Sequence, residues 1–183
     1  LDIVRTRAVL ALPAEVTSHN TVPTAAGLAS SASGFAALAL AASRAAGLDL
    51  DAKELSELAR RGSGSAARSI FGGFAEMDAG HDPDGSDAVA RPLLSEDAWD
   101  VRLVVAVASA GAKALGSTEA LNRTAATSPY YRPWVESVAR DLDDARTAVL
   151  ARDLDGLGPV VERSCMRMHA SAMGAEPFIL YWN

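Results

Sequence analysis

The chain has 183 residues, of which 49% are hydrophobic and 5% aromatic, and its formal charge is -6. This length and hydrophobic content suffice for one sizeable core or two small lobes, and they exclude a disordered tail. The negative charge excludes a general affinity for nucleic acid or an anionic membrane surface, and no apolar run approaches the roughly 20 residues of a transmembrane helix. The single cysteine, Cys165, excludes an internal disulfide and indicates a reducing, cytoplasmic compartment.

The first twenty residues are expected to form two short elements. Residues 1–12 are typical of the end of a helix or of a short strand, which Pro13 stops. Residues 14–20 alternate in polarity, and we interpret them as a strand. The chain opens on Leu1 without a leader and closes on an apolar run before Asn183, so we expect an internal piece of a larger protein.

A loop of small residues with serines at a helix start is the most informative feature. Residues 23–34 read Pro-Thr-Ala-Ala-Gly-Leu-Ala-Ser-Ser-Ala-Ser-Gly, and an alanine-rich helix follows. Gly27 allows a positive φ and a close backbone approach to an anion, while the unpaired N–H groups and the dipole of a helix start favour negative charge. The pattern indicates a polyphosphate site to which serine hydroxyls add donors or hold Mg²⁺. No Lys follows, so this is not a P-loop, and the alternative is a plain loop before a packed helix.

Two helices are predicted after this loop. The first ends before Gly47, which stands at the C′ position, and its apolar face consists of Phe35, Leu38 and Ala42. The second begins at Asp51, which can form a capping box with Glu54, and it closes at Gly62.

Two strands and two long helices are predicted for the remainder. Residues 70–77 indicate a strand whose internal glycine pair, Gly72 and Gly73, suggests a bulge or a close backbone approach. Residues 80–87 indicate an exposed turn, and residues 101–108 a buried strand. The long helices have apolar faces made by Trp134, Val138, Leu142, Ala145 and Val149, and by Leu157, Val161, Cys165, Met168 and Ala172. A lobe boundary is expected at the turn of residues 82–85 or near residues 91–100.

A second polar cluster, residues 62–69, is a candidate phosphate or diphosphate clamp. Ser65 and Arg68 are three residues apart and share a face of a helical turn, and Ser63 can reach the same anion. A guanidinium donates two parallel hydrogen bonds to such oxygens. The alternative is a Ser-Gly turn with a solvated arginine. Ser117, at the start of a later helix, is a weaker third candidate, with an ordinary N-cap as its alternative.

Two phosphate-like sites in one short chain indicate a nucleotide and a phosphorylated substrate that meet for phosphoryl transfer. By contrast, His19, His81 and His169 lack metal-ligand spacing with one another or with Cys165, so a zinc site is not expected. Cys165 is expected to be a core residue rather than a nucleophile.

Two segments carry a family resemblance. Residues 18–32, Ser-His-Asn-Thr-Val-Pro-Thr-Ala-Ala-Gly-Leu-Ala-Ser-Ser-Ala, resemble the ATP-phosphate loop of mevalonate diphosphate decarboxylases, which belong to the GHMP kinase superfamily. Residues 63–69, Ser-Gly-Ser-Ala-Ala-Arg-Ser, followed by Phe-Gly-Gly-Phe, resemble the family's substrate-diphosphate segment. Shorter matches follow in order at residues 116–119, 127–129, 168–170 and 181–183. The likeness covers essentially the whole chain.

The resemblance implies a function in the mevalonate pathway of isoprenoid biosynthesis, namely the ATP-dependent decarboxylation of mevalonate 5-diphosphate to isopentenyl diphosphate. ATP and Mg²⁺ would bind the loop, with Ser31 as the metal contact and Ala26, Gly27, Leu28, Ala29, Ser30, Ser31 and Ser33 as the nucleotide-binding residues. The substrate would bind Ser63, Ser65, Arg68 and Ser117, of which Arg68 and Ser117 are the expected catalytic residues.

The implied fold is α+β, a two-lobed GHMP kinase-like fold that is incomplete at both ends. Residues 1–95 would be part of a ribosomal protein S5 domain 2-like nucleotide-binding lobe, and residues 96–183 part of a helix-rich α/β lobe. The family's Lys-Tyr-Trp-Gly-Lys segment and its catalytic Asp base, in an Asp-Ala-Gly-Pro stretch, are absent from the chain, so we expect little or no turnover by this chain alone. The family also suggests a homodimer. The alternatives are a phosphomevalonate decarboxylase, a mevalonate kinase-like enzyme and a non-catalytic truncated homologue.

Overall fold

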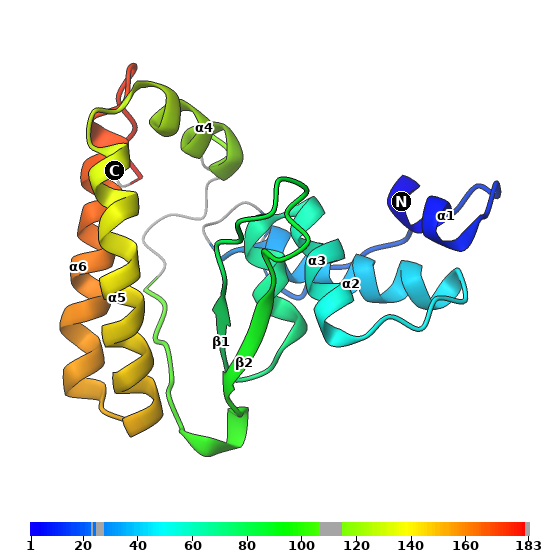
Figure 1. The fold of residues 1–183 in the computed structure, drawn as a ribbon, viewed down its shortest axis with the longest axis horizontal. Coiled ribbons are helices and arrows are strands. Elements are labelled where there is room, and N and C mark those ends of the chain that lie inside the picture. Colours follow the sequence, from blue (N-terminus) through cyan, green and yellow to red (C-terminus); the bar gives the residue numbers. More distant parts are fainter. Residues whose placement is uncertain (23, 25–27, 107–114, 182–183) are drawn as a thin grey trace. The chain divides into compact units, whose positions relative to one another are not determined.

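The computed structural model describes residues 1–22, 24, 28–106 and 115–181, and the chain divides into two compact units, Leu1–Ala112 and Lys113–Asn183 (Figure 1). The described part of the first unit combines helices with a two-stranded sheet, and that of the second is helical. None of the helices in these ranges is long and apolar enough to cross a membrane. The lobe boundary at residue 95 stays a prediction.

Small residues pack the helices of the first unit against one another. The helices are α1 (Asp2–Ala8), α2 (Ser30–Ala45), α3 (Ala52–Gly62) and the 3-10 helix η1 (Gly64–Ile70). Their shared core consists of Val4, Ala39, Leu58, Ala59 and Ala66. The alanines allow α2, α3 and η1 to approach one another closely, so that η1 is held on a densely packed base.

Cap geometry confirms the predicted limits of the helices that follow the loop. The Glu54 N–H donates to the Asp51 carboxylate at 2.8 Å, and the Asp51 N–H donates to the Glu54 carboxylate at 2.9 Å, which completes the capping box of α3. At the end of α2, Gly47 has a φ of +74°, its own N–H donates to the Arg44 carbonyl, and the Leu48 N–H donates to the Ser43 carbonyl. This is the Schellman arrangement expected of a C′ glycine.

The strands β1 (Phe74–Met77) and β2 (Ala90–Leu94) form an antiparallel pair. The strand predicted over residues 70–77 is therefore correct only in its second half, because η1 extends to Ile70. Gly73, with a φ of +68°, makes the predicted close backbone approach, since a Cβ atom there would collide with the carbonyl oxygen of Leu94. The predicted turn of residues 80–87 lies between the strands and is largely exposed. After β2, the short 3-10 helix η2 (Glu96–Ala98) closes the hairpin region.

Two predicted strands are wrong. Residues 14–20 and 101–106 have no regular secondary structure, and residues 107 and 108 of the second prediction lie outside the described residues. Leu103 and Val104 are 89% and 97% exposed rather than buried. A strand needs a neighbouring strand for its backbone hydrogen bonds, and the described residues offer none beside either segment.

The second unit contains α4 (Ser117–Thr127), α5 (Tyr131–Ala151) and α6 (Leu154–Met173), of which α5 and α6 lie side by side (Figure 1). Both long helices were predicted, but their apolar faces are only partly correct. Val149 and Ala172 are buried, whereas Val138 and Val161 are 40% and 56% exposed. Cys165 is exposed as well, so its assignment to the core is wrong.

A buried carboxylate joins α5 to α6. Arg163 Nε donates to Asp141 Oδ1 at 2.8 Å, and Arg167 Nη1 donates to Asp141 Oδ2 at 2.9 Å, while the Asp141 side chain is 6% exposed. Burial raises the pKa of Asp141, but the hydrogen bonds and charges of the two arginines outweigh it and hold this pKa below its ordinary value of 3.8. The stabilisation is therefore present above about pH 4 and is lost as the pH falls through the lowered pKa.

We expect Asp141→Asn to lower the free energy of unfolding by about 3 kcal/mol, because Arg167 loses its carboxylate partner and Arg163 retains only Asp144 among the described carboxylates. Asp143→Asn is the matched control, since the Asp143 side chain is 71% exposed and pairs with Arg146 on the surface; its cost should stay below about 1 kcal/mol. Urea unfolding followed by circular dichroism measures both. The loss in the free energy of unfolding should be larger for Asp141→Asn than for Asp143→Asn at neutral pH, and this difference should shrink as the pH falls toward about 3. Equal losses at neutral pH would contradict the prediction.

Candidate anion-binding site

The start of α2 is a helix N-terminus without a side-chain cap. Its N-cap, Ala29, has a φ of +52° and makes no side-chain cap hydrogen bond, and the first turn holds no acidic residue. α3, by contrast, has both halves of a capping box. An uncapped helix start leaves N–H groups and the positive end of the dipole available to an anion.

The predicted nucleotide-binding residues are described only in part. Ala26 and Gly27 lie outside the described residues. Leu28, Ala29, Ser31 and Ser33 are exposed, and Ser30 is half-buried. The Ser33 hydroxyl donates to the Ser30 carbonyl at 3.2 Å, within the first turn. Ser31 is therefore an exposed hydroxyl residue in the first turn of α2.

The second predicted cluster lies on η1, where the 3-10 repeat places residues three apart on one face. Ser65 and Arg68 occupy that face, and the hydroxyl oxygens of Ser63 and Ser65 are 3.4 Å apart. The opposite face is anchored by Ala66 and Ala67, which are both 0% exposed. A rigid, buried base thus carries an outward-facing guanidinium and two hydroxyls.

Arg68 is exposed, and its Nη1 donates to the Met77 sulfur at 3.7 Å. Within the described ranges, no carboxylate pairs with Arg68, whereas several other arginines have such partners. Sequence reasoning missed Met77, since its proximity depends on β1 folding back beside η1. The thioether is a weak acceptor, so the cationic charge of Arg68 stays available to an anionic ligand.

The two clusters belong to one packed body. α2 contacts η1 and α3, and a Cβ atom on Gly62, just before Ser63, would collide with the ring of Phe35 in α2. The absence of a side chain at Gly62 thus allows the Phe35 ring to pack against it. The third candidate, Ser117, is the first residue of α4 in the other unit, with Gly116 as its N-cap.

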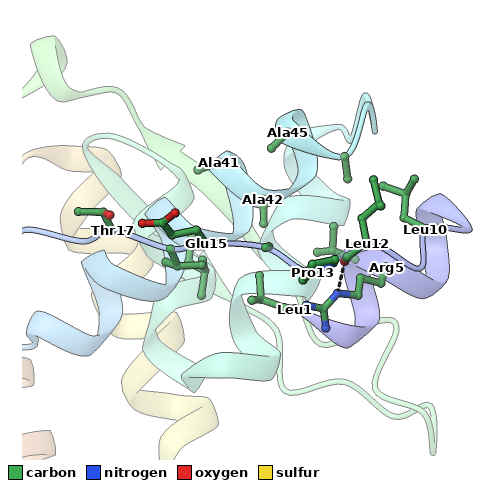
Figure 2. A pocket seen from close by; sticks show the side chains of 15 residues that line it. Leu1, Arg5, Leu10, Leu12, Pro13, Glu15, Thr17, Ala41, Ala42 and Ala45 are labelled. Atoms are coloured by element: carbon green, nitrogen blue, oxygen red, sulfur yellow. Dashed lines mark hydrogen bonds between the residues drawn. The ribbon is translucent and has the colours of Figure 1, made fainter.

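A separate hollow lies beside α1, away from the two predicted clusters. It has a volume of about 400 Å³ and is lined by α1, residues 10–17 and the second half of α2 (Figure 2). The alanines 41, 42 and 45 form its α2 wall, and Arg5 Nε donates to the Leu12 carbonyl at 3.1 Å across its rim. Its lining is mainly apolar and includes no residue of the two predicted clusters, so it does not serve the predicted anion chemistry.

The histidines, Cys165 and the carboxylates do not form a metal centre among the described residues. No group of three metal-ligating side chains exists among the residues that the structure describes. His169 packs edge-to-face on Tyr181, with ring centroids 5.8 Å apart.

Family models match both parts of the chain. The diphosphomevalonate decarboxylase-like N-terminal domain matches residues 1–90, and the mevalonate 5-diphosphate decarboxylase C-terminal domain matches residues 103–183. The diphosphomevalonate decarboxylase of Homo sapiens is 41% identical over 177 residues, 95% of this chain and 43% of that protein. That of Ganoderma lucidum is 38% identical over 170 residues, with coverages of 92% and 42%. The chain therefore spans less than half the length of these relatives.

Solved structures match the chain over its whole length. The mevalonate diphosphate decarboxylase from Enterococcus faecalis gives a TM-score of 0.83 at 42% identity, and that from Staphylococcus aureus gives 0.85 at 40% identity. Each match covers 100% of this chain and 55% of the solved chain. A further match, with a TM-score of 0.85 and 41% identity, is a complex with MVAPP, AMPPCP and magnesium.

Proposed function

This chain belongs to the diphosphomevalonate decarboxylase family, and we propose that it carries the ATP-phosphate loop and substrate clamp of an enzyme that converts mevalonate 5-diphosphate to isopentenyl diphosphate. The predicted α+β, GHMP kinase-like fold is confirmed by the structural matches. Because the chain spans about half of the matched structures, the activity, its substrates and its cofactors are proposals for this chain.

The observation that carries the proposal is Arg68, an exposed guanidinium that has only a thioether partner among the described side chains and stands on a buried turn. Together with Ser63 and Ser65 it offers hydrogen bonds to the oxygens of a diphosphate. A fixed base lowers the cost of ordering these groups when the ligand binds. Their role is to hold and orient the substrate.

The start of α2 is the proposed nucleotide site. The positive end of its dipole, an N-cap without a capping side chain and the lack of acidic residues in its first turn suit the phosphates of ATP. Ser31 would help to hold Mg²⁺, which neutralises the charge of the phosphate oxygens during phosphoryl transfer. A related structure is a complex with MVAPP, AMPPCP and magnesium, which supports a nucleotide and a magnesium ion as ligands.

The proposed reaction transfers the γ-phosphoryl group of ATP to the tertiary hydroxyl of mevalonate 5-diphosphate. Cleavage of the C–O bond to that phosphate and of the bond to the carboxylate carbon then releases inorganic phosphate and CO₂, with isopentenyl diphosphate and ADP as the other products. We assign this chain's residues to binding and orientation, with Ser117 near the transferred group. Such sites act by positioning and by charge stabilisation.

Nucleotide binding tests the proposal directly. Titration of AMPPCP into the protein with Mg²⁺ should give saturable heat, and Ser31→Ala should weaken binding by about tenfold, since a hydrogen bond or metal contact to a charged group is lost. The deficit should be smaller without Mg²⁺. Ser137→Ala is the matched control, because that hydroxyl donates to the Trp134 carbonyl within α5. An unchanged affinity for Ser31→Ala in Mg²⁺ would contradict the metal role.

We also infer a reducing, cytoplasmic compartment from the single, exposed Cys165. A homodimer stays a prediction that the mass in solution would test.

A further inference from the structure

One buried hydroxyl connects three elements around Arg68. Ser56 lies in α3 and is 0% exposed. Its Oγ donates to the Ala67 carbonyl of η1 at 3.1 Å and accepts the Ala90 N–H of β2 at 2.8 Å. Ala67 immediately precedes Arg68 in the chain, so the first of these bonds fixes the backbone beside the guanidinium.

The bond from the Ala90 N–H to Ser56 is linked to Arg68 through the strand pair. Ala90 pairs with Met77 in the register of β1 and β2, and the Met77 sulfur accepts the hydrogen bond from Arg68. Ser56 is therefore linked to Arg68 through its backbone neighbour and also through the strand pair that carries its side-chain contact. These links span 11 and 34 residues in sequence, a separation that no local pattern reveals.

Burial makes this connection hard to replace. Ala67 is 0% exposed and Ala90 is 3% exposed, so bulk water has little access to the backbone groups that Ser56 satisfies. Without the hydroxyl, a buried N–H and a buried carbonyl lose their partner, and the chain must shift to satisfy them. Such a shift would move η1 relative to β2, and Arg68 with it.

We propose that Ser56 is a positioning residue for Arg68: its buried hydroxyl fixes η1 against the strand pair, so that the guanidinium is held ready for a diphosphate that Ser56 itself does not touch. This inference rests on the proposed function of Arg68 as a diphosphate ligand. Ser43 provides a matched comparison, because its buried hydroxyl is 1% exposed and its one bond among the described residues goes to the Ala39 carbonyl within α2.

The test compares two ligands by calorimetry in Ser56→Ala, Ser56→Cys and Ser43→Ala, at a temperature where circular dichroism shows each variant folded. Ser56→Cys keeps the side-chain shape with a slightly larger atom in place of the oxygen, and its thiol is only a weak hydrogen-bonding group. Both Ser56 variants should bind mevalonate 5-diphosphate about tenfold more weakly and bind AMPPCP with Mg²⁺ as the unchanged protein does. Ser43→Ala should lower the melting temperature without altering either affinity. In an Arg68→Gln background, Ser56→Ala should have no further effect on diphosphate affinity.

The outcomes separate this inference from the proposed function. If Arg68→Gln loses the diphosphate but both Ser56 variants retain it with full affinity, the positioning role is overturned and the proposed function stands. A parallel loss of both ligands in the Ser56 variants would also overturn it, because that pattern indicates a general structural role. If the unchanged, folded protein binds no diphosphate, the proposed function fails and this inference falls with it.

Discussion

Arg68→Gln should weaken the binding of mevalonate 5-diphosphate by about 100-fold, because glutamine retains polarity but removes the charge and the paired N–H groups that suit a diphosphate. Arg68 stands on a turn whose other face is completely buried. The loss should therefore reflect a missing ligand contact rather than a displaced segment. Titration calorimetry of the folded variant measures it, and AMPPCP affinity should change little.

Arg44→Gln is the control for a general loss of positive charge. Arg44 is exposed in the last turn of α2, at the opposite end from the proposed nucleotide site, and it has no ion pair among the residues described. Its replacement should leave diphosphate affinity unchanged. An equal loss in both variants would indicate a nonspecific electrostatic effect, and unchanged binding by Arg68→Gln would remove the residue from the clamp.

Titration of mevalonate 5-phosphate in parallel distinguishes the proposed diphosphate decarboxylase from a monophosphate decarboxylase. A clamp made by one guanidinium and two hydroxyls gains hydrogen bonds from a second phosphate group. We therefore expect the diphosphate to bind at least about tenfold more tightly than the monophosphate. The reverse preference would favour the alternative enzyme.

Local chemistry made part of this structure predictable. The capping box of Asp51 and Glu54 and the C′ glycine at position 47 depend on contacts within a few residues, and both were confirmed. The common face of Ser65 and Arg68 follows from their spacing of three, and the 3-10 helix η1 displays it as expected. In each case the residues that determine the geometry are neighbours in sequence.

Predictions failed where the partner is distant. Residues 14–20 and 101–106 have a strand-like pattern, but a pattern cannot supply the neighbouring strand. The apolar pattern of the long helices also did not predict the ion pairs between α5 and α6, where Asp141 accepts hydrogen bonds from Arg163 and Arg167, 22 and 26 residues away. Ser56 was missed for the same reason, since its partners lie on other elements. These non-local polar contacts are what hold the candidate site and the helices in register.

Gly73→Ala should produce the largest loss of stability in the first unit. Its φ of +68° costs an alanine about 1 kcal/mol or more, and the added Cβ would also collide with the Leu94 carbonyl oxygen and lie 2.6 Å from the Glu96 nitrogen. Backbone atoms cannot turn aside as a side chain can, so the β1–β2 pair must separate locally. We expect the free energy of unfolding to fall by about 3 kcal/mol, measured by urea unfolding.

Gly47→Ala isolates the collision from the backbone strain. Gly47 has nearly the same φ, +74°, but no described atom lies within 4 Å of its Cβ position. Its replacement should therefore lower the free energy of unfolding by only about 1 kcal/mol. The larger loss expected for Gly73→Ala then measures the cost of the collision alone. Because β1 carries Met77, which contacts Arg68, Gly73→Ala should also weaken diphosphate binding, whereas Gly47→Ala should not. Equal costs at the two glycines would show that β1 can move away from β2 without penalty, which would also weaken the case that this strand pair fixes the position of Arg68.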